Sequence, residues 1–177
     1  GSNTSGQTTV PLLDTAGVKA ISGGWLHSVA LKSDGSLVGW GEDNWNQSTV
    51  PAGLTGVIAF DAGDAHNVAL VSDGTVTAWG ADDYGQSTVP PGLTGVIAVS
   101  AGGSHTMVLK SDGSVVTWGR DNSGQAWPAD SPTSGIVAVS AGEEFNLALK
   151  SDGTVVAWGA NTFGQTTVPP GLTGVVA

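Results

Sequence analysis

Apolar and polar residues alternate in short runs along this chain. In one such run His66, Val68 and Leu70 fall on one side, and the residues between them fall on the other. A period of two is typical of a β-strand with one buried face. No stretch combines a helical period with a capping residue, so we predict an all-β protein.

The run belongs to a unit that occurs four times. Each unit carries Ser-Asp-Gly, with successive steps of 39, 39 and 40 residues, and a Trp-Gly pair that follows with the same steps. Repeats of this length are typical of solenoids, propellers and arrays. The Ser-Asp-Gly motifs contain Asp34, Asp73, Asp112 and Asp152, and the Trp-Gly pairs contain Trp40, Trp79, Trp118 and Trp158.

Within one unit the pattern predicts four short strands. They cover residues 57–60, 66–70, 75–79 and 86–90, and Ser-Asp-Gly forms the tight turn between the second and the third. In such a turn Asp bonds the backbone ahead of it, and Gly accepts a positive φ. Four strands in about 40 residues make one blade of a β-propeller. We therefore predict a β-propeller of four-stranded antiparallel blades, with about four blades in this chain.

The repeats also divide the chain into blades. We predict four blades in succession, at residues 17–55, 56–94, 95–134 and 135–173. Residues 1–16 are interpreted as the Gly1-Ser2 scar of a cleaved tag followed by a leftover outer strand, and residues 174–177 as a stub of the next inner strand.

The two ends of the chain share a hexapeptide. Gly6–Pro11 has the same sequence as Gly164–Pro169, so the chain begins on an outer strand whose blade is otherwise missing. An open half-ring would expose about six apolar side chains on each end face, each worth about 1.5–3 kcal/mol when buried. We expect either a piece of a longer propeller or a dimer that completes a ring, with eight blades as the simplest sum. A self-closed ring of four blades is the alternative.

Composition narrows the partner classes. The 177 residues include 15 acidic and 5 basic side chains, for a net charge of −10. Such a balance argues against a nucleic-acid binder, which needs Lys and Arg to replace phosphate counterions. The absence of cysteine excludes a disulfide scaffold, a thiolate zinc site and a cysteine nucleophile. No apolar run is long enough to span a membrane, and no signal peptide is visible.

The acidic residues gather in particular loops. In an up-and-down blade the first-to-second and third-to-fourth loops share one face, which here receives eight acids and one base, a net of −7. Exposed aromatics ringed by charge are typical of protein-binding surfaces. We predict a protein partner with a basic surface. The candidate partner-binding residues are Trp25, Glu42, Asp43, Trp45, Asp64, Asp82, Asp83, Tyr84, Glu143, Glu144 and Phe163.

The repeated residues are predicted to be structural. Histidine recurs at one repeat position, as His27, His66 and His105, but Phe145 takes this position in the fourth repeat. Phe can replace a packed ring but not a ligand or a catalytic base, so we expect each imidazole to bond neighbouring backbone. The Trp-Gly tryptophans are predicted to be core, and the Ser-Asp-Gly aspartates turn formers. No nucleophile–base pair, phosphate loop or calcium loop stands out, so we expect no enzymatic activity, cofactor or metal.

The repeated motifs resemble those of a known family. Ala-Gly before His-(Ser/Asn/Thr), then Leu-x-Ser-Asp-Gly, Trp-Gly and Gly-Gln, are similar to the regulator-of-chromosome-condensation (RCC) repeat. The Gln-(Ser/Thr)-Thr-Val-Pro tail most resembles the secreted bacterial branch that includes the second type of β-lactamase inhibitory protein. The resemblance implies a propeller, usually with seven blades, which would need about 270 residues. It also implies a location outside a bacterium or at its surface.

The resemblance carries expectations for the loops. In the inhibitor branch, aromatics on this face grip the partner, and Trp45, Tyr84 and Phe163 match those of its third-to-fourth loops. The positions of its other aromatics hold Leu26, Ala65, Ser104 and Glu144. The family's nucleotide exchange needs a wedge insertion, for which the four uniform repeats leave no room.

Two other functions stay open at this stage. Aromatics beside carboxylates also suit a carbohydrate-binding or adhesive module of a cell surface, with one site per blade. Alternatively, the chain is a structural repeat fragment that assembles into a complete propeller and has no further activity. A calcium-dependent form of any of these stays open, because Asp82-Asp83 and Glu143-Glu144 are adjacent acids.

Overall fold

The computed structural model describes residues 1–11, 17–126 and 134–176, and within them the regular structure is all β. Twelve strands form four antiparallel sheets, which we call blades 1 to 4. Blade 1 contains β1 (Val18–Gly23), β2 (His27–Lys32) and β3 (Leu37–Gly41), and blade 2 contains β4 (Val57–Ala62), β5 (His66–Val71) and β6 (Val76–Gly80). Blade 3 contains β7 (Val96–Ala101), β8 (His105–Lys110) and β9 (Val115–Gly119), and blade 4 contains β10 (Ile136–Ala141), β11 (Phe145–Lys150) and β12 (Val155–Gly159). The predicted all-β propeller fold is confirmed. Parts of the predicted boundaries, at 12–16, 127–133 and 177, lie outside the described residues.

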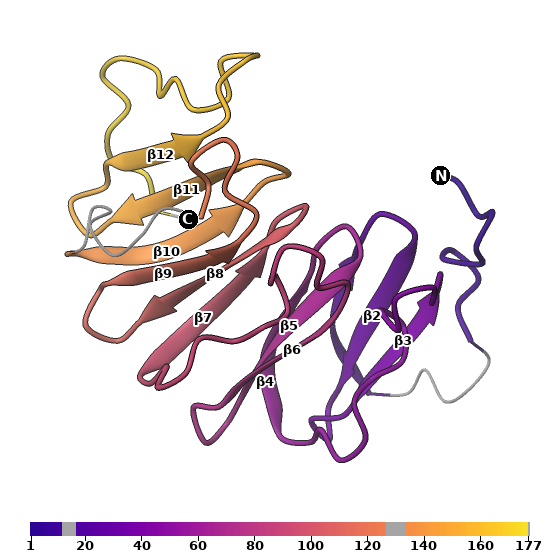
Figure 1. Ribbon diagram of the computed structural model, residues 1–177. Helices are drawn as coiled ribbons and strands as arrows, with labels where there is room; N and C mark the ends of the chain where they lie inside the picture. Colours follow the sequence, from indigo (N-terminus) through magenta and orange to yellow (C-terminus); the bar gives the residue numbers. More distant parts are fainter. Residues whose placement is uncertain (12–16, 127–133, 177) are drawn as a thin grey trace.

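The four blades follow one another around an arc, with blade 1 at one end and blade 4 at the other (Figure 1). The first strands of neighbouring blades are joined through one carboxylate. Ser22 Oγ in β1 donates to Asp61 Oδ1 at 2.8 Å, and Ser100 Oγ in β7 donates to Asp61 Oδ2 at 3.1 Å. β1, β4 and β7 are therefore the inner strands of successive propeller blades.

The Ser-Asp-Gly turns have the predicted geometry. In blade 1 the backbone N–H of Ser36 donates to Asp34 Oδ1 at 3.0 Å, and Gly35 has a φ of 81°. The other three turns repeat the hydrogen bond to the aspartate, at 2.9 to 3.0 Å. In blade 1 the hydrogen bonds that Ser36 donates, first from its hydroxyl and then from its backbone N–H, lower the pKa of Asp34.

Where the structure describes it, the fourth segment of a blade differs from the prediction. Residues 86–90, expected as a strand, form a turn and an irregular stretch, in which Thr88 N–H bonds Gly85 O at 3.1 Å. The backbone groups of this segment bond to turns and side chains instead of to a fourth ladder, and Pro90 has no N–H to donate. The blades are therefore three-stranded sheets, each followed by an outer segment. We define the outer segments by their first residues, Gln47, Gln86, Gln125 and Gln165.

The hydrophobic core lies between the blades. Between blades 1 and 2, Leu31 and Val57 are buried at 1% and 3% exposure, and Trp79 packs in the same cluster. Two further clusters occupy the equivalent positions between blades 2 and 3 and between blades 3 and 4. Each such side chain contributes about 1.5–3 kcal/mol by burial, so every blade depends on its neighbours for stability.

The repeated histidines connect each blade to the next. His27, His66 and His105 are buried, with exposures of 1%, 0% and 0%. The Nε2 atom of His66 lies 2.9 Å from Thr106 Oγ1, and Thr106 Oγ1 donates in turn to Gln86 O at 2.8 Å. Because the hydroxyl hydrogen of Thr106 is used on Gln86, the imidazole must donate its Nε2–H. We expected a backbone partner for the imidazole, and the structure shows that Nε2 bonds a side chain of the following blade.

The same relay occurs in the other two junctions. His27 Nε2 lies 2.9 Å from Asn67 Oδ1, and Asn67 Nδ2 donates to Gln47 O at 2.8 Å. His105 Nε2 lies 2.9 Å from Asn146 Oδ1, and Asn146 Nδ2 donates to Gln125 O at 2.8 Å. In sequence the partner is separated from its histidine by a whole repeat, so the local pattern did not indicate it.

Candidate protein-binding face

One edge of the arc carries both sets of acidic loops. Because each sheet is antiparallel, the first strand and the third strand of a blade end at the same edge. In blade 1 the two loops are joined by the hydrogen bond from Glu42 N–H to Leu26 O, at 2.8 Å, and the other blades repeat this bond. We call this the loop edge, made of residues 24–26, 42–46, 63–65, 81–85, 102–104, 120–124, 142–144 and 160–164.

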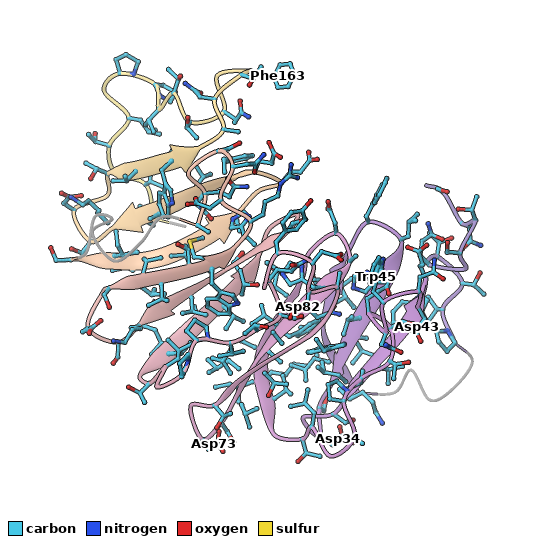
Figure 2. All side chains as sticks on the ribbon, in the orientation of Figure 1. Asp34, Asp43, Trp45, Asp73, Asp82 and Phe163 are labelled. Atoms are coloured by element: carbon cyan, nitrogen blue, oxygen red, sulfur yellow. The ribbon has the colours of Figure 1, made fainter. Side chains whose placement is uncertain are left out.

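The Ser-Asp-Gly turns lie at the opposite edge, which we call the turn edge. Figure 2 shows Asp34 and Asp73 at the bottom of the molecule, away from Trp45, Asp82 and Phe163. The predicted separation of the two kinds of loop therefore agrees with the structure.

Three aromatic residues occupy one repeat position on the loop edge. Trp45, Tyr84 and Phe163 are 50%, 52% and 92% exposed. Their backbones are fixed, because the N–H of each donates to the side-chain Oε1 of the glutamine two residues later, at 2.8 to 2.9 Å. Ser123 has the same bond in blade 3. An exposed ring on a fixed backbone loses little conformational freedom when it binds.

The only base predicted for this edge, Arg120, is held by its neighbours. Its guanidinium lies 5.2 Å from the centre of the Tyr84 ring, and Nη1 lies 3.3 Å from Glu144 Oε1. The arrangement joins blades 2, 3 and 4 across the loop edge. It also neutralises Glu144, so the unpaired acidic charge lies elsewhere on this edge.

A hollow of about 530 Å³ lies where the inner strands reach the loop edge. Trp25 stands at its rim with 74% exposure. Asp64 and Glu143 also line it and lie over Gly103, the Cα of which has no side chain to separate them. Burial raises the pKa of Asp64, and the nearby charge of Glu143 adds to the rise. A cation in this hollow would compensate both effects.

Two of the acids predicted to bind a partner accept hydrogen bonds from the backbone of their own loops. Asp43 Oδ1 accepts the N–H groups of Ser48 and Thr49 at 2.8 and 2.9 Å, and Asp82 accepts the N–H of Ser87 at 2.9 Å. For both groups, burial would raise the pKa, but hydrogen bonds led by those of Thr49 and Thr88 lower it. The recurring hydroxyl residues five and six positions after the aspartate were the signal for this structural role. Asn161 makes the same contacts in blade 4.

The repeats match a family model over most of the chain. The model is the regulator of chromosome condensation (RCC1) repeat, and it matches residues 18–47, 57–86, 96–125 and 136–165. The chain belongs to the RCC1 repeat family. No curated protein matches it.

Solved structures show the same fold. Yeast RCC1 (Prp20) bound to Kap60 is 19% identical with a TM-score of 0.77, over 94% of this chain and 49% of that one. Prp20p of Saccharomyces cerevisiae, studied for its binding to Gsp1p and histones, is 21% identical with a TM-score of 0.68, over 89% and 48%. The ectodomain of the Physcomitrella patens receptor kinase CR4 is 22% identical with a TM-score of 0.71, over 90% and 45%. This RCC1-repeat chain therefore spans about half the length of these neighbours.

Within the described part of the RCC1-repeat chain, no three His, Asp or Glu side chains are grouped to hold a metal ion. The three histidines lie in separate junctions, and each uses Nε2 for the next blade. The same residues include no helix that could cross a membrane. Sequence reasoning missed Asp61, whose role depends on serines one repeat away on either side.

Proposed function

We propose that this RCC1-repeat chain is a non-enzymatic protein-binding module and that it binds its partner with the loop edge. The observation that carries the proposal is the set of Trp45, Tyr84 and Phe163, which are exposed on fixed backbones along the loop edge. Aromatic side chains of this kind are the usual energetic centres of protein interfaces. The family relationship supports a binding role.

The chemistry of the hollow indicates the kind of partner. Asp64 and Glu143 lie close enough to affect each other, and burial disfavours the charge on Asp64. A Lys or Arg side chain entering beside Trp25 would pair with these carboxylates and contact the indole. The other acids of the loop edge would speed the approach of a basic surface. We therefore propose a partner that inserts a basic side chain at the hollow and covers the aromatic residues of the loop edge.

The proposal is tested with two matched triple variants. A partner captured with the wild-type chain is identified, and its dissociation constant is measured by calorimetry. Replacing Trp45, Tyr84 and Phe163 by Ala should weaken binding at least about 100-fold, since each removes an exposed aromatic contact.

The matched control changes apolar residues at the turn edge. Ile58, Ile97 and Val137 are 50%, 55% and 52% exposed at the start of their inner strands. Replacing them by Ala should change the dissociation constant by less than about two-fold. Loss of binding in this control, with wild-type affinity in the loop variant, would overturn the proposal. Glycan binding that the loop variant abolishes would favour the carbohydrate alternative instead.

We further propose that the chain associates with a second copy of itself. The supporting observation is the open face of blade 1, where Ile21 in β1 is 77% exposed. Its equivalents Phe60 and Val99 are half-buried against the preceding blade. Kinship with the secreted bacterial branch, and a location outside the cell or at its surface, remain proposals that rest on the Gln-(Ser/Thr)-Thr-Val-Pro tail.

A further inference from the structure

Each outer segment presents one carbonyl to the blade that follows it. Gln86 O accepts Thr106 Oγ1 at 2.8 Å and Trp118 Nε1 at 3.0 Å, both from blade 3. Gln47 O accepts Asn67 Nδ2 and Trp79 Nε1 from blade 2 in the same way, at 2.8 and 3.3 Å. Blades 2 and 3 therefore each carry a two-donor site for the outer segment of the preceding blade. In blade 4 only Asn146 Nδ2 donates to Gln125 O, at 2.8 Å, and the buried Trp158 Nε1 has no partner among the described residues.

Blade 1 has the same site, although the chain contains no complete blade before it. Ser28 Oγ and Trp40 Nε1 supply the two donors, and both bond Gln7 O, at 2.9 and 2.8 Å. Gln7 is 8% exposed. The N-terminal segment Gly6–Pro11 thus takes the place of an outer segment without the sheet that normally supports one.

The outer segment of blade 4 is not bound to a following blade among the described residues. Gly164–Pro169 has the same sequence as Gly6–Pro11, and Gly6 and Gly164 share a left-handed φ of 77° and 82°. Among the described residues none donates to Gln165 O. One segment of the pair is therefore bound to a blade, and the other has no blade bound to it among the described residues.

We propose that the Ser28–Trp40 site of one copy binds Gly164–Pro169 of a second copy in exchange for its own Gly6–Pro11. The N-terminal segment is then an internal competitor that limits head-to-tail association. The inference rests on the self-association proposed above and adds the contact that makes it and the segment that opposes it.

The apolar surroundings of the site fit the same occupant. A groove of about 490 Å³ beside it is lined by Val18, Ile21, Val38 and Trp40 together with Val10 and Pro11. In blade 4, Leu149 and Val155 stand at the positions of Leu31 and Leu37, which pack against the next blade within the chain. Leu149 is already buried at 8% exposure and Val155 is half-buried, so a second copy would mainly supply the outer segment that a preceding blade supplies at the internal junctions.

Two substitutions in the full chain test the exchange, because they should act in opposite directions. No atom would crowd a Cβ at Gly6 or Gly164, so a side chain there acts mainly through the left-handed φ. Gly6→Val should loosen the internal competitor and lower the dissociation constant of self-association at least ten-fold. Gly164→Val should loosen the incoming segment and raise it at least ten-fold. Sedimentation equilibrium over a range of concentrations measures both.

A peptide provides the second measurement. The acetylated peptide Gly-Gln-Thr-Thr-Val-Pro, added in excess, should dissociate the Gly6→Val assembly. Self-association that neither glycine substitution alters would overturn the exchange while leaving self-association in place. A monomer at all concentrations, for the wild-type chain and for Gly6→Val, would overturn both. Neither result would bear on partner binding at the loop edge, which the aromatic variants test separately.

Discussion

The junctions between blades and the loop edge are built from the same four repeats, but they use different positions. In each junction, the side chain that follows the histidine position accepts a hydrogen bond from the histidine of the preceding blade. The same side chain donates to the outer segment of that blade, and the residues around it are buried. On the loop edge, the repeat fixes the backbone through a glutamine, while the residue displayed changes from Trp45 to Tyr84 to Ser123 to Phe163. The positions whose side chains make the same hydrogen bond in every repeat therefore hold the fold, even where the residue changes from Ser28 to Asn67 to Thr106, and the positions whose side chains are exposed are available for recognition.

The largest effect is expected where a histidine ring touches a neighbouring glycine. A Cβ at Gly63 would collide with the His66 ring and with the carbonyl oxygen of Gly102 in the next blade. Because a backbone atom would have to move, Gly63→Ala should lower the free energy of unfolding by about 3 kcal/mol or more. Denaturant unfolding checks this. Gly23→Ala, where no atom lies within 4 Å, is the control and should stay within about 0.5 kcal/mol.

A smaller loss is expected from breaking one relay. Thr106→Val keeps the shape of the side chain, but it removes the acceptor for His66 Nε2–H and a donor to Gln86 O. Leaving buried polar groups without partners should cost about 2–3 kcal/mol. The exposed Thr94→Val is the matched control. A wild-type midpoint for Thr106→Val would mean that the relay does not contribute to the junction.

Acid should weaken the junctions before it affects the turns. Burial lowers the pKa of His66 to about 4, and it also lowers the pKa of His27 and His105. The unfolded chain, with a histidine pKa near 6.5, binds protons that the folded chain does not, so stability is highest above that pH and falls as the pH drops toward 4. His66 alone should cost about 2 kcal/mol by pH 5.

Unfolding midpoints measured between pH 7 and pH 4 check this expectation. The pKa of the Ser-Asp-Gly aspartates is lowered by their turn hydrogen bonds, so those groups act only below about pH 4. His66→Phe should reduce the slope of the profile between pH 6.5 and pH 4, and the slope that is left should come from His27 and His105. A slope that this variant leaves unchanged would assign the acid sensitivity to other groups.

Sequence patterns alone predicted the fold class, the turns and the edge on which the acidic loops lie. Those features depend on contacts within one repeat, such as the bond from Ser36 N–H to Asp34. The prediction of a fourth strand was wrong, because the backbone of the outer segment bonds elsewhere: its glutamine carbonyl accepts a hydrogen bond from a side chain of the next blade. The partners of the histidines and the role of Asp61 were also missed, since those contacts join residues 39 to 41 positions apart.

The smallest effect on stability is expected for the aromatic residues of the loop edge, which should have the largest effect on binding. Trp45, Tyr84 and Phe163 are at least half exposed, so replacing all three by Ala should change the free energy of unfolding by only about 1 kcal/mol. Hydrogen exchange of the chain with and without its bound partner shows directly whether the loop edge is the binding face. We predict slower exchange in residues 42–46, 81–85, 142–144 and 160–164, with no change in the turns at 33–36 and 72–75. Protection of those turns, with unchanged exchange along the loop edge, would contradict the claim.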